Sequence, residues 1–168
     1  QGGGNITLRN LTVGHDVEPG MCSGSVVRCE YSSGLNIEKC KLYGSGTYGV
    51  EAQGCSYVNV INTDIYECTY GLVDLTNSST VTVRNCELRD SSGFAMFELS
   101  GCYDILFEDC KIHDNDSTAF EYSDGRFIVT GEYGNATFRN CEFKNNRYKE
   151  FSDRADGVTL DKCTIDNH

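Results

Sequence analysis

Apolar and polar residues alternate along this chain in short runs that return at regular intervals. The run VTVRNCEL occupies residues 81–88. Related runs are LNIEKCKL at 35–42, VNVINTDI at 58–65, ILFEDCKI at 105–112, ATFRNCEF at 136–143 and VTLDKCTI at 158–165, and ITLRNLTV at 6–13 is a looser copy. Alternation with a period of two residues is typical of β-strands with one buried face. The chain therefore consists of a repeated strand unit.

The spacing of these runs predicts a solenoid. The sixth residue of each run marks a reference position, and these positions are Leu11, Cys40, Thr63, Cys86, Cys110, Cys141 and Cys163. Most steps between them are 22 to 24 residues long, a period typical of coils that bury their faces against one another. Two steps are longer, which predicts insertions at 14–24 in the first coil and at roughly 126–133 in the fifth.

Each coil is predicted to hold three short strands. Apolar residues lie five and three positions before the reference position, and again at it and two positions after it. The phase changes in between, so the chain must bend at the preceding residue, where Asn or Asp tolerates a left-handed backbone. A third apolar pair follows in the coils, namely Val50 and Ala52, Val73 and Leu75, Phe97 and Leu99, and Phe120 and Tyr122. The expected fold is an all-β, parallel β-helix of about seven coils.

The cysteines at the reference positions are expected to face the core. Leu11 and Thr63 occupy the same place in other coils, so the position favours a small or medium buried group, which a free cysteine supplies. Disulfides along this column are not expected, because side chains in register point the same way. Three further cysteines, Cys22, Cys29 and Cys68, could include a pair, and the sequence leaves this open.

A leucine-rich repeat is the alternative architecture, because its repeat has a similar length and a similar L-x-x-N/C-x-L phrase. That fold expects a further leucine eight residues before the reference position. The chain has Ser32, Cys55, Ser78 and Cys102 there, which favours the β-helix.

Composition narrows the function. The 168 residues suffice for a single β-helix domain spanning 1–168. No apolar run is long enough to cross a bilayer, so membrane insertion is not expected. The net charge of −11 argues against nucleic acid and anionic lipid as partners, and it is compatible with cations or neutral glycans.

One strand face is unusually acidic. The outward residues of the third strand are expected to stack as Arg28, Glu51, Asp74, Glu98 and Glu121. Like charges on neighbouring strands destabilise a sheet unless a cation intervenes. The pattern therefore predicts a cation or glycan site, with Glu51, Asp74, Glu98 and Glu121 as the metal ligands and calcium as the candidate cofactor. The alternative is an acidic stripe that is merely solvated.

Loops next to this face add candidate substrate-binding residues. Tyr48 and Tyr70 could contact a sugar ring, which has an apolar face and hydroxyls. The inserted segment GHDVEPGMCSG is expected to bring His15 and Asp16 near Arg28, where His15 could act as a base. The sequence assigns no catalytic residue.

The phrases NIEKCKLYGSGTYGV, NVINTDIYECTYGL and DILFEDCKIHDND resemble right-handed β-helix repeats of the pectate-lyase-like class, specifically the carbohydrate-binding and sugar-hydrolase type. This resemblance covers nearly the whole chain. It implies a right-handed coil and an extracellular or cell-surface carbohydrate-binding or carbohydrate-active module. The class also includes adhesins and non-enzymatic repeats, so the alternative is a non-catalytic structural or adhesive spacer of a surface protein.

Both chain ends are expected to leave coil edges unpaired, because no capping helix precedes Ile6 and the chain stops soon after Ile165. The expectation is a segment of a larger protein, with stacking or flanking domains at the coil ends.

Overall fold

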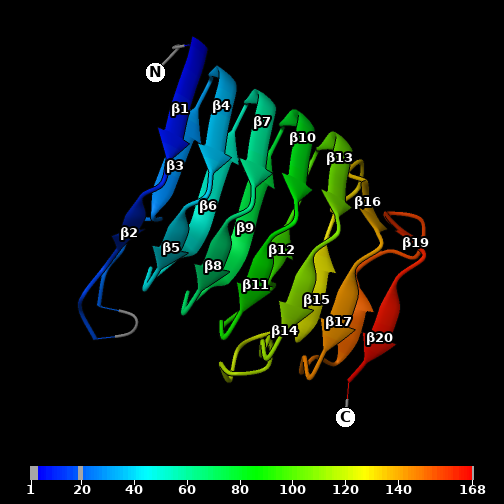
Figure 1. The fold of residues 1–168 in the computed structure, drawn as a ribbon. Coiled ribbons are helices and arrows are strands. Elements are labelled where there is room, and N and C mark those ends of the chain that lie inside the picture. The colour runs from blue at the N-terminus through cyan, green and yellow to red at the C-terminus, as the bar shows by residue number, and fades with distance from the viewer. Residues whose placement is uncertain (1–3, 19–20, 168) are drawn as a thin grey trace.

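The computed structural model describes residues 4–18 and 21–167, and all regular structure among them is β-strand. The strands form a right-handed solenoid of three parallel sheets, with six complete coils and two strands of a seventh (Figure 1). This confirms the predicted fold class. Among the described residues there is no helix of the length and apolarity needed to span a membrane.

Each sheet collects one strand from successive coils, so sequence neighbours lie in different sheets (Figure 1). Sheet A holds β1 (Gly4–Arg9), β4 (Ser33–Glu38), β7 (Ser56–Ile61), β10 (Ser79–Arg84), β13 (Tyr103–Glu108), β16 (Ala136–Arg139) and β19 (Val158–Asp161). Sheet B holds β2 (Thr12–Gly14), β5 (Lys41–Tyr43), β8 (Asp64–Tyr66), β11 (Glu87–Arg89), β14 (Lys111–His113), β17 (Glu142–Lys144) and β20 (Thr164–Asp166). Sheet C holds β3 (Val27–Glu30), β6 (Tyr48–Gln53), β9 (Gly71–Thr76), β12 (Phe97–Glu98), β15 (Arg126–Val129) and β18 (Glu150–Ser152).

The bend between sheets A and B lies where the sequence predicts it. Asn62, Asn85, Asp109 and Asn140 adopt left-handed conformations, with φ between 51° and 55°. Asn and Asp accept this conformation at little cost because their short side chains can hydrogen-bond locally. The same bend occurs at Lys39 and at Lys162, so the position demands the conformation even where the residue does not favour it.

The core runs through the middle of the solenoid and is widest in the fourth to sixth coils. There Phe107 stacks on Phe138 with ring centroids 4.5 Å apart, and Phe97 meets Phe107 edge-on at 5.1 Å. All three side chains are fully buried. Offset and edge-to-face aromatic pairs add roughly 0.5–1.5 kcal/mol each beyond their buried area.

The reference cysteines lie inside the bend between sheets A and B. Cys40, Cys86, Cys110 and Cys141 are buried free thiols, and Cys163 is half-buried. The Cys110 Sγ donates to the carbonyl oxygens of Val83 in the coil before it (3.4 Å) and Glu108 in its own coil (3.3 Å). A thiol suits this place because it fills a small apolar space and still offers a donor to a carbonyl at the bend.

The other two bends contain comparable columns of small polar side chains. Between sheets C and A, the Ser78 Oγ accepts the N–H of Cys55 (3.0 Å) and the Cys102 Sγ accepts the N–H of Ser78 (3.4 Å). Burial raises the pKa of Cys102 to about 11, so its thiol stays protonated and donates to the Leu75 carbonyl at 3.1 Å. We call these buried side chains at the three bends the corner columns.

Between sheets B and C the corner column changes from Cys68 and Ser91 to asparagines. The Asn146 Oδ1 accepts the N–H of Asn115 (3.2 Å), and the Asn146 Nδ2 donates to the Ile112 carbonyl of the coil before it (2.8 Å). The amide of Asn146 therefore links its own coil to two backbone groups of the coil before it. Leaving such buried groups unpaired would cost roughly 1–3 kcal/mol each.

Of the cysteines whose pairing the sequence left open, Cys29 and Cys68 are buried, and Cys22 is half-buried in the first inserted segment. All three are free thiols, and the Cys22 Sγ accepts the N–H of Gly46 at 2.6 Å.

Candidate ligand-binding face of sheet C

Sheet C carries a column of charged residues on its outer face. The register places Arg28 beside Glu51, Glu51 beside Asp74, and Asp74 beside Glu98 on four successive strands. Strand spacing in a sheet is about 4.8 Å, so these carboxylates form a continuous line. We call Glu51, Asp74 and Glu98 the acidic column.

The predicted fifth member, Glu121, is not in this column. Glu98 pairs with Val129 of β15, whereas Glu121 is exposed in the connection 114–125 that precedes this strand. The prediction was wrong because Phe127 and Ile128, both fully buried, form the strand in place of Phe120 and Tyr122. The insertion in the fifth coil accordingly lies mostly in the connection before β15 (Arg126–Val129). The prediction that placed it at 126–133 was therefore wrong.

The outer face of sheet A shows how the solenoid normally handles charge. Arg84 pairs with Glu108 at 2.8 Å, and Arg139 pairs with Asp161 at 3.0 Å across neighbouring coils. Among the described residues, the acidic column has one such partner, at its first member, where the Glu51 carboxylate accepts from Ser25 (2.6 Å) and pairs with Arg28 (3.3 Å). Sheet C therefore retains carboxylates that the pairing seen on sheet A would neutralise.

The unneutralised carboxylates have perturbed acidity. Burial, followed by the negative charge of Glu51, raises the pKa of Asp74, and its hydrogen bond from Thr76 at 3.3 Å opposes this only in part. Burial, Asp74 and Asp153 raise the pKa of Glu98 to about 7. Within the described residues, Glu98 has no hydrogen bond or ion pair. Such half-buried, unpaired carboxylates are characteristic of binding or catalytic sites.

Four aromatic rings line one side of the acidic column. Tyr70 meets Tyr48 edge-on at 6.3 Å and Phe94 edge-on at 5.2 Å, and Phe94 lies 5.1 Å from Phe120. Burial and then the charges of the acidic column raise the pKa of Tyr48, so its phenol remains a hydrogen-bond donor. We call these four residues the aromatic ridge. Tyr48 and Tyr70 are thus brought together with the acidic column, as the sequence suggested.

A small cavity joins the acidic column to the ridge. Its volume is about 140 Å³, and it is lined by Phe94, Ala95, Glu98, Tyr122, Ser123, Asp124, Gly125, Arg126 and Val129. It thus offers a carboxylate and a guanidinium between aromatic walls. The sequence did not predict it, because one wall comes from the misassigned connection.

His15 and Asp16 lie away from this site. The N–H of His15 donates to the Tyr43 carbonyl at the end of sheet B (3.1 Å), and Asp16 is exposed in the connection that follows. Within the described part of the chain, neither forms a hydrogen bond or ion pair with Arg28. The guanidinium of Arg28 instead contacts Glu30 and Glu51.

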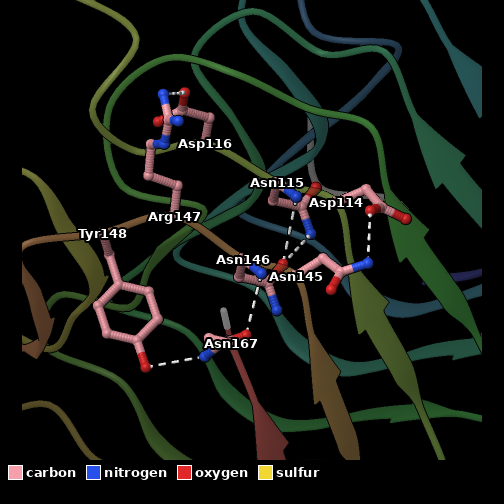
Figure 2. Close-up of a pocket in the computed structure, with 8 residues that line it drawn as sticks. All are labelled: Asp114, Asn115, Asp116, Asn145, Asn146, Arg147, Tyr148 and Asn167. Atoms are coloured by element: carbon pink, nitrogen blue, oxygen red, sulfur yellow. Dashed lines mark hydrogen bonds and ion pairs between the residues drawn. The ribbon is translucent and has the colours of Figure 1, made fainter.

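A larger cavity of about 590 Å³ lies at the bend between sheets B and C in the fifth and sixth coils (Figure 2). It is lined by Asp114, Asn115, Asp116, Asn145, Asn146, Arg147, Tyr148 and Asn167. Its buried amides belong to the corner column and already pair with backbone groups, and Arg147 approaches Asp116 at 3.6 Å. The repeated phrases HDND at 113–116 and KNNR at 144–147 are the sequence signal for this polar bend. Because these side chains already pair with groups of the protein, the cavity is a weaker candidate for a ligand site than the outer face of sheet C.

A further ionisable group is His113, which the sequence suggested for the loops beside the acidic face and which lies on the outer face of sheet B. Its Nδ1 lies 2.7 Å from Asp114 and its Nε2 lies 2.9 Å from Glu87. Partial burial opposes the charged form, but the two carboxylates outweigh it and raise the pKa of His113. This arrangement ties the fourth coil to the fifth.

Comparisons with known proteins agree with this architecture. The family model described as "Right handed beta helix region" matches residues 1–165. The crystal structure of pectate lyase Pel9A is similar with a TM-score of 0.54 and 13% identity, over 89% of this chain and 48% of that chain. The structure of QnrB1, a plasmid-mediated fluoroquinolone resistance protein, was aligned over 99% of this chain and 93% of the QnrB1 chain at 14% identity. Its TM-score is only 0.19.

The search of curated proteins gave no match. The chain spans less than half of the pectate lyase chain, and identity this low shows a shared fold alone. The family match, in contrast, covers nearly every residue. The chain belongs to the right-handed β-helix family.

Proposed function

We propose that this β-helix binds a carbohydrate along the outer face of sheet C, using the acidic column and the aromatic ridge. The observation that supports this proposal most directly is that Asp74 and Glu98, which lie beside Tyr48 and Tyr70, have no cationic partner among the described residues. Carboxylates accept hydrogen bonds from sugar hydroxyls, while aromatic rings contact the apolar face of the sugar. The two groups run side by side over several coils, which suits an extended ligand.

The charge of the face favours neutral or cationic glycans over polyuronates. A line of carboxylates on a chain of net charge −11 repels a polyanion at neutral pH. The similar fold of a pectate lyase supports a carbohydrate ligand by analogy alone. Glu98 also suits proton transfer near neutral pH, because general acids and bases work best when their pKa lies close to the working pH.

Calcium is the less supported part of the proposal. Carboxylate oxygens are the ligands calcium prefers, but it requires about six to eight oxygens. Among the described residues, no three His, Cys, Asp or Glu side chains are grouped to hold a metal ion. Calcium would therefore need oxygen atoms from the glycan as well as from Asp74 and Glu98.

The test is binding to a panel of soluble neutral, cationic and acidic polysaccharides, first with calcium and then with EDTA. The double variant Asp74→Asn, Glu98→Gln should lose about thirtyfold in affinity, since two lost hydrogen bonds at about 1 kcal/mol each amount to about 2 kcal/mol. Glu142→Gln is the matched control, because it removes an exposed carboxylate from the outer face of sheet B. Unchanged binding in the double variant would contradict the proposed site, and unchanged binding in EDTA would exclude a calcium requirement.

The second candidate is a structural or adhesive spacer in a longer surface protein, with residues 1–168 as one extracellular β-helix segment. It is favoured by the ion-paired face of sheet A and by the buried corner columns, which stiffen the coils without serving a ligand. Failure of the whole panel to bind would favour this candidate.

A further inference from the structure

The connection 114–125 is unusually long for this solenoid. The equivalent connections between sheets B and C are 44–47, 67–70, 90–96 and 145–149, and the one comparably long connection, 15–26, is in the first coil. Long loops on a regular scaffold commonly carry a function, because the fold itself does not need them. The connection 114–125 also contributes a wall to the cavity beside Glu98.

Internal contacts hold this connection in one shape. Ser123 is only 6% exposed, and its Oγ donates to the Ser117 carbonyl at 2.5 Å and accepts the N–H of Gly125 at 3.1 Å. Lys149 of the next coil donates to the Ser123 carbonyl at 3.2 Å. Phe120 reaches back to Phe94, as part of the aromatic ridge. The connection is therefore a formed wall rather than a loose loop.

The acidic column ends at the same place. After Glu98 the next outward residue of sheet C is Val129, so the column stops at the fourth coil. At the rim of the cavity, Arg126 is tied to Asp124 and Glu150, each at 3.3 Å. An extended ligand that follows the acidic column from Glu51 thus meets an apolar residue, a wall and an ion-paired rim.

The cavity at this end has room for a single small unit. Its volume of about 140 Å³ is well below the roughly 300–1,000 Å³ of sites that enclose larger ligands. Phe94 and Tyr122 supply the apolar walls, and Glu98 and Arg126 supply polar groups. Tyr122 is 87% exposed, so most of its ring is accessible to a ligand at the edge of the cavity.

We infer that the connection 114–125 blocks the binding face of sheet C at the fifth coil, so that the site takes the end of a glycan chain. The terminal sugar then lies in the cavity between Phe94, Glu98 and Tyr122. This rests on the proposed carbohydrate function and adds a specificity to it. A chain that continued past its terminal sugar would collide with the wall. The interior of a long polysaccharide is therefore excluded, and each chain offers one place to bind.

The experiment is the stoichiometry of binding by calorimetry. The probes are two soluble linear polysaccharides, mixed-linkage β-glucan and chitosan, each used as an intact polymer and as the short oligosaccharides cut from it, so that every chain has a single terminal sugar of each kind. Recognition of chain ends predicts one protein per chain at every length. A number of proteins per chain that rises with chain length would overturn the inference while leaving the proposed function intact. Failure of all probes to bind would overturn both.

Two variants test the cavity itself. Tyr122→Ala should weaken binding by about tenfold without changing the fold, because loss of one aromatic contact is worth about that factor. Tyr103→Ala is the matched control, an exposed tyrosine on β13 of sheet A. Replacing 118–124 by a short Gly-Ser link should allow several proteins to bind each long chain, provided that circular dichroism shows a folded β-helix. Unchanged affinity in Tyr122→Ala would also overturn the inference.

Discussion

Replacing Glu98 by glutamine should stabilise this protein at alkaline pH and change little at acidic pH. Glu98 is half-buried next to Asp74 and Asp153, and this environment raises its pKa to about 7 from its ordinary value of 4.5. The folded state therefore holds a proton on Glu98 that the unfolded chain has already released. Glutamine keeps nearly the same shape without a charge, so it isolates the cost of ionising this group.

The sign and the size follow from proton linkage. Between about pH 4.5 and pH 7 the folded state binds more protons than the unfolded state, so stability falls as the pH rises through this window. Above the pKa that Glu98 has in the folded state, the full loss of stability is present. A rise of the Glu98 pKa from 4.5 to about 7 corresponds to a loss of about 3 kcal/mol in the free energy of unfolding. Partial exposure screens the charge, so the expected gain for Glu98→Gln is about 1–2 kcal/mol at alkaline pH.

The assay is urea unfolding of parent and variant at about pH 5 and about pH 8.5, followed by circular dichroism. Comparing the two proteins at each pH cancels the titration of all groups that they share. Glu142→Gln on the outer face of sheet B is the control and should show no comparable gain. A Glu98→Gln variant that is equally or less stable than the parent at the higher pH would refute the reasoning.

Three further predictions concern the bends and sheet B. Cys110→Ser should cost about 1 kcal/mol or less because it keeps a small donor, whereas Cys110→Val should cost about 1–2 kcal/mol because the one S–H donor shared by the Val83 and Glu108 carbonyls is lost; urea unfolding measures both. Asn146→Leu should cost about 1–3 kcal/mol in the same assay, because it leaves the buried N–H of Asn115 without its acceptor. His113→Gln should cost about 0.5–1 kcal/mol below about pH 6, and this cost should vanish as the pH rises through the raised pKa of His113, as unfolding over a pH series would show.

Sheets A and B could be predicted well because a single physical pattern determines them. Alternating apolar residues define each strand, and the Asn or Asp before the reference position marks the left-handed bend, as at Asn85. Sheet C was harder in the fifth coil, because two apolar pairs fall within the same interval. Phe120 is as apolar as Phe127, and only the stacking of the whole coil decides which is buried.

The candidate site could be predicted only in part, for a related reason. The line of Glu51, Asp74 and Glu98 follows from the repeat, since in-register strands stack equivalent positions. The raised pKa of Glu98 does not follow from the repeat, because it depends on how deeply neighbouring segments bury the carboxylate. The cavity likewise depends on where the connection 114–125 folds back, which local sequence does not reveal.

The corner columns also have a consequence for how the length of this molecule can change. Buried side chains at a bend link neighbouring coils, as Cys110 does by contacting the Glu108 carbonyl of its own coil and the Val83 carbonyl of the coil before it. Neighbouring coils are therefore matched to each other through these polar groups. Removing or duplicating one complete repeat keeps all of these groups matched, whereas deleting one residue within a repeat shifts every later side chain out of place. Length in this chain is thus expected to vary by whole coils, as discrete steps along the axis.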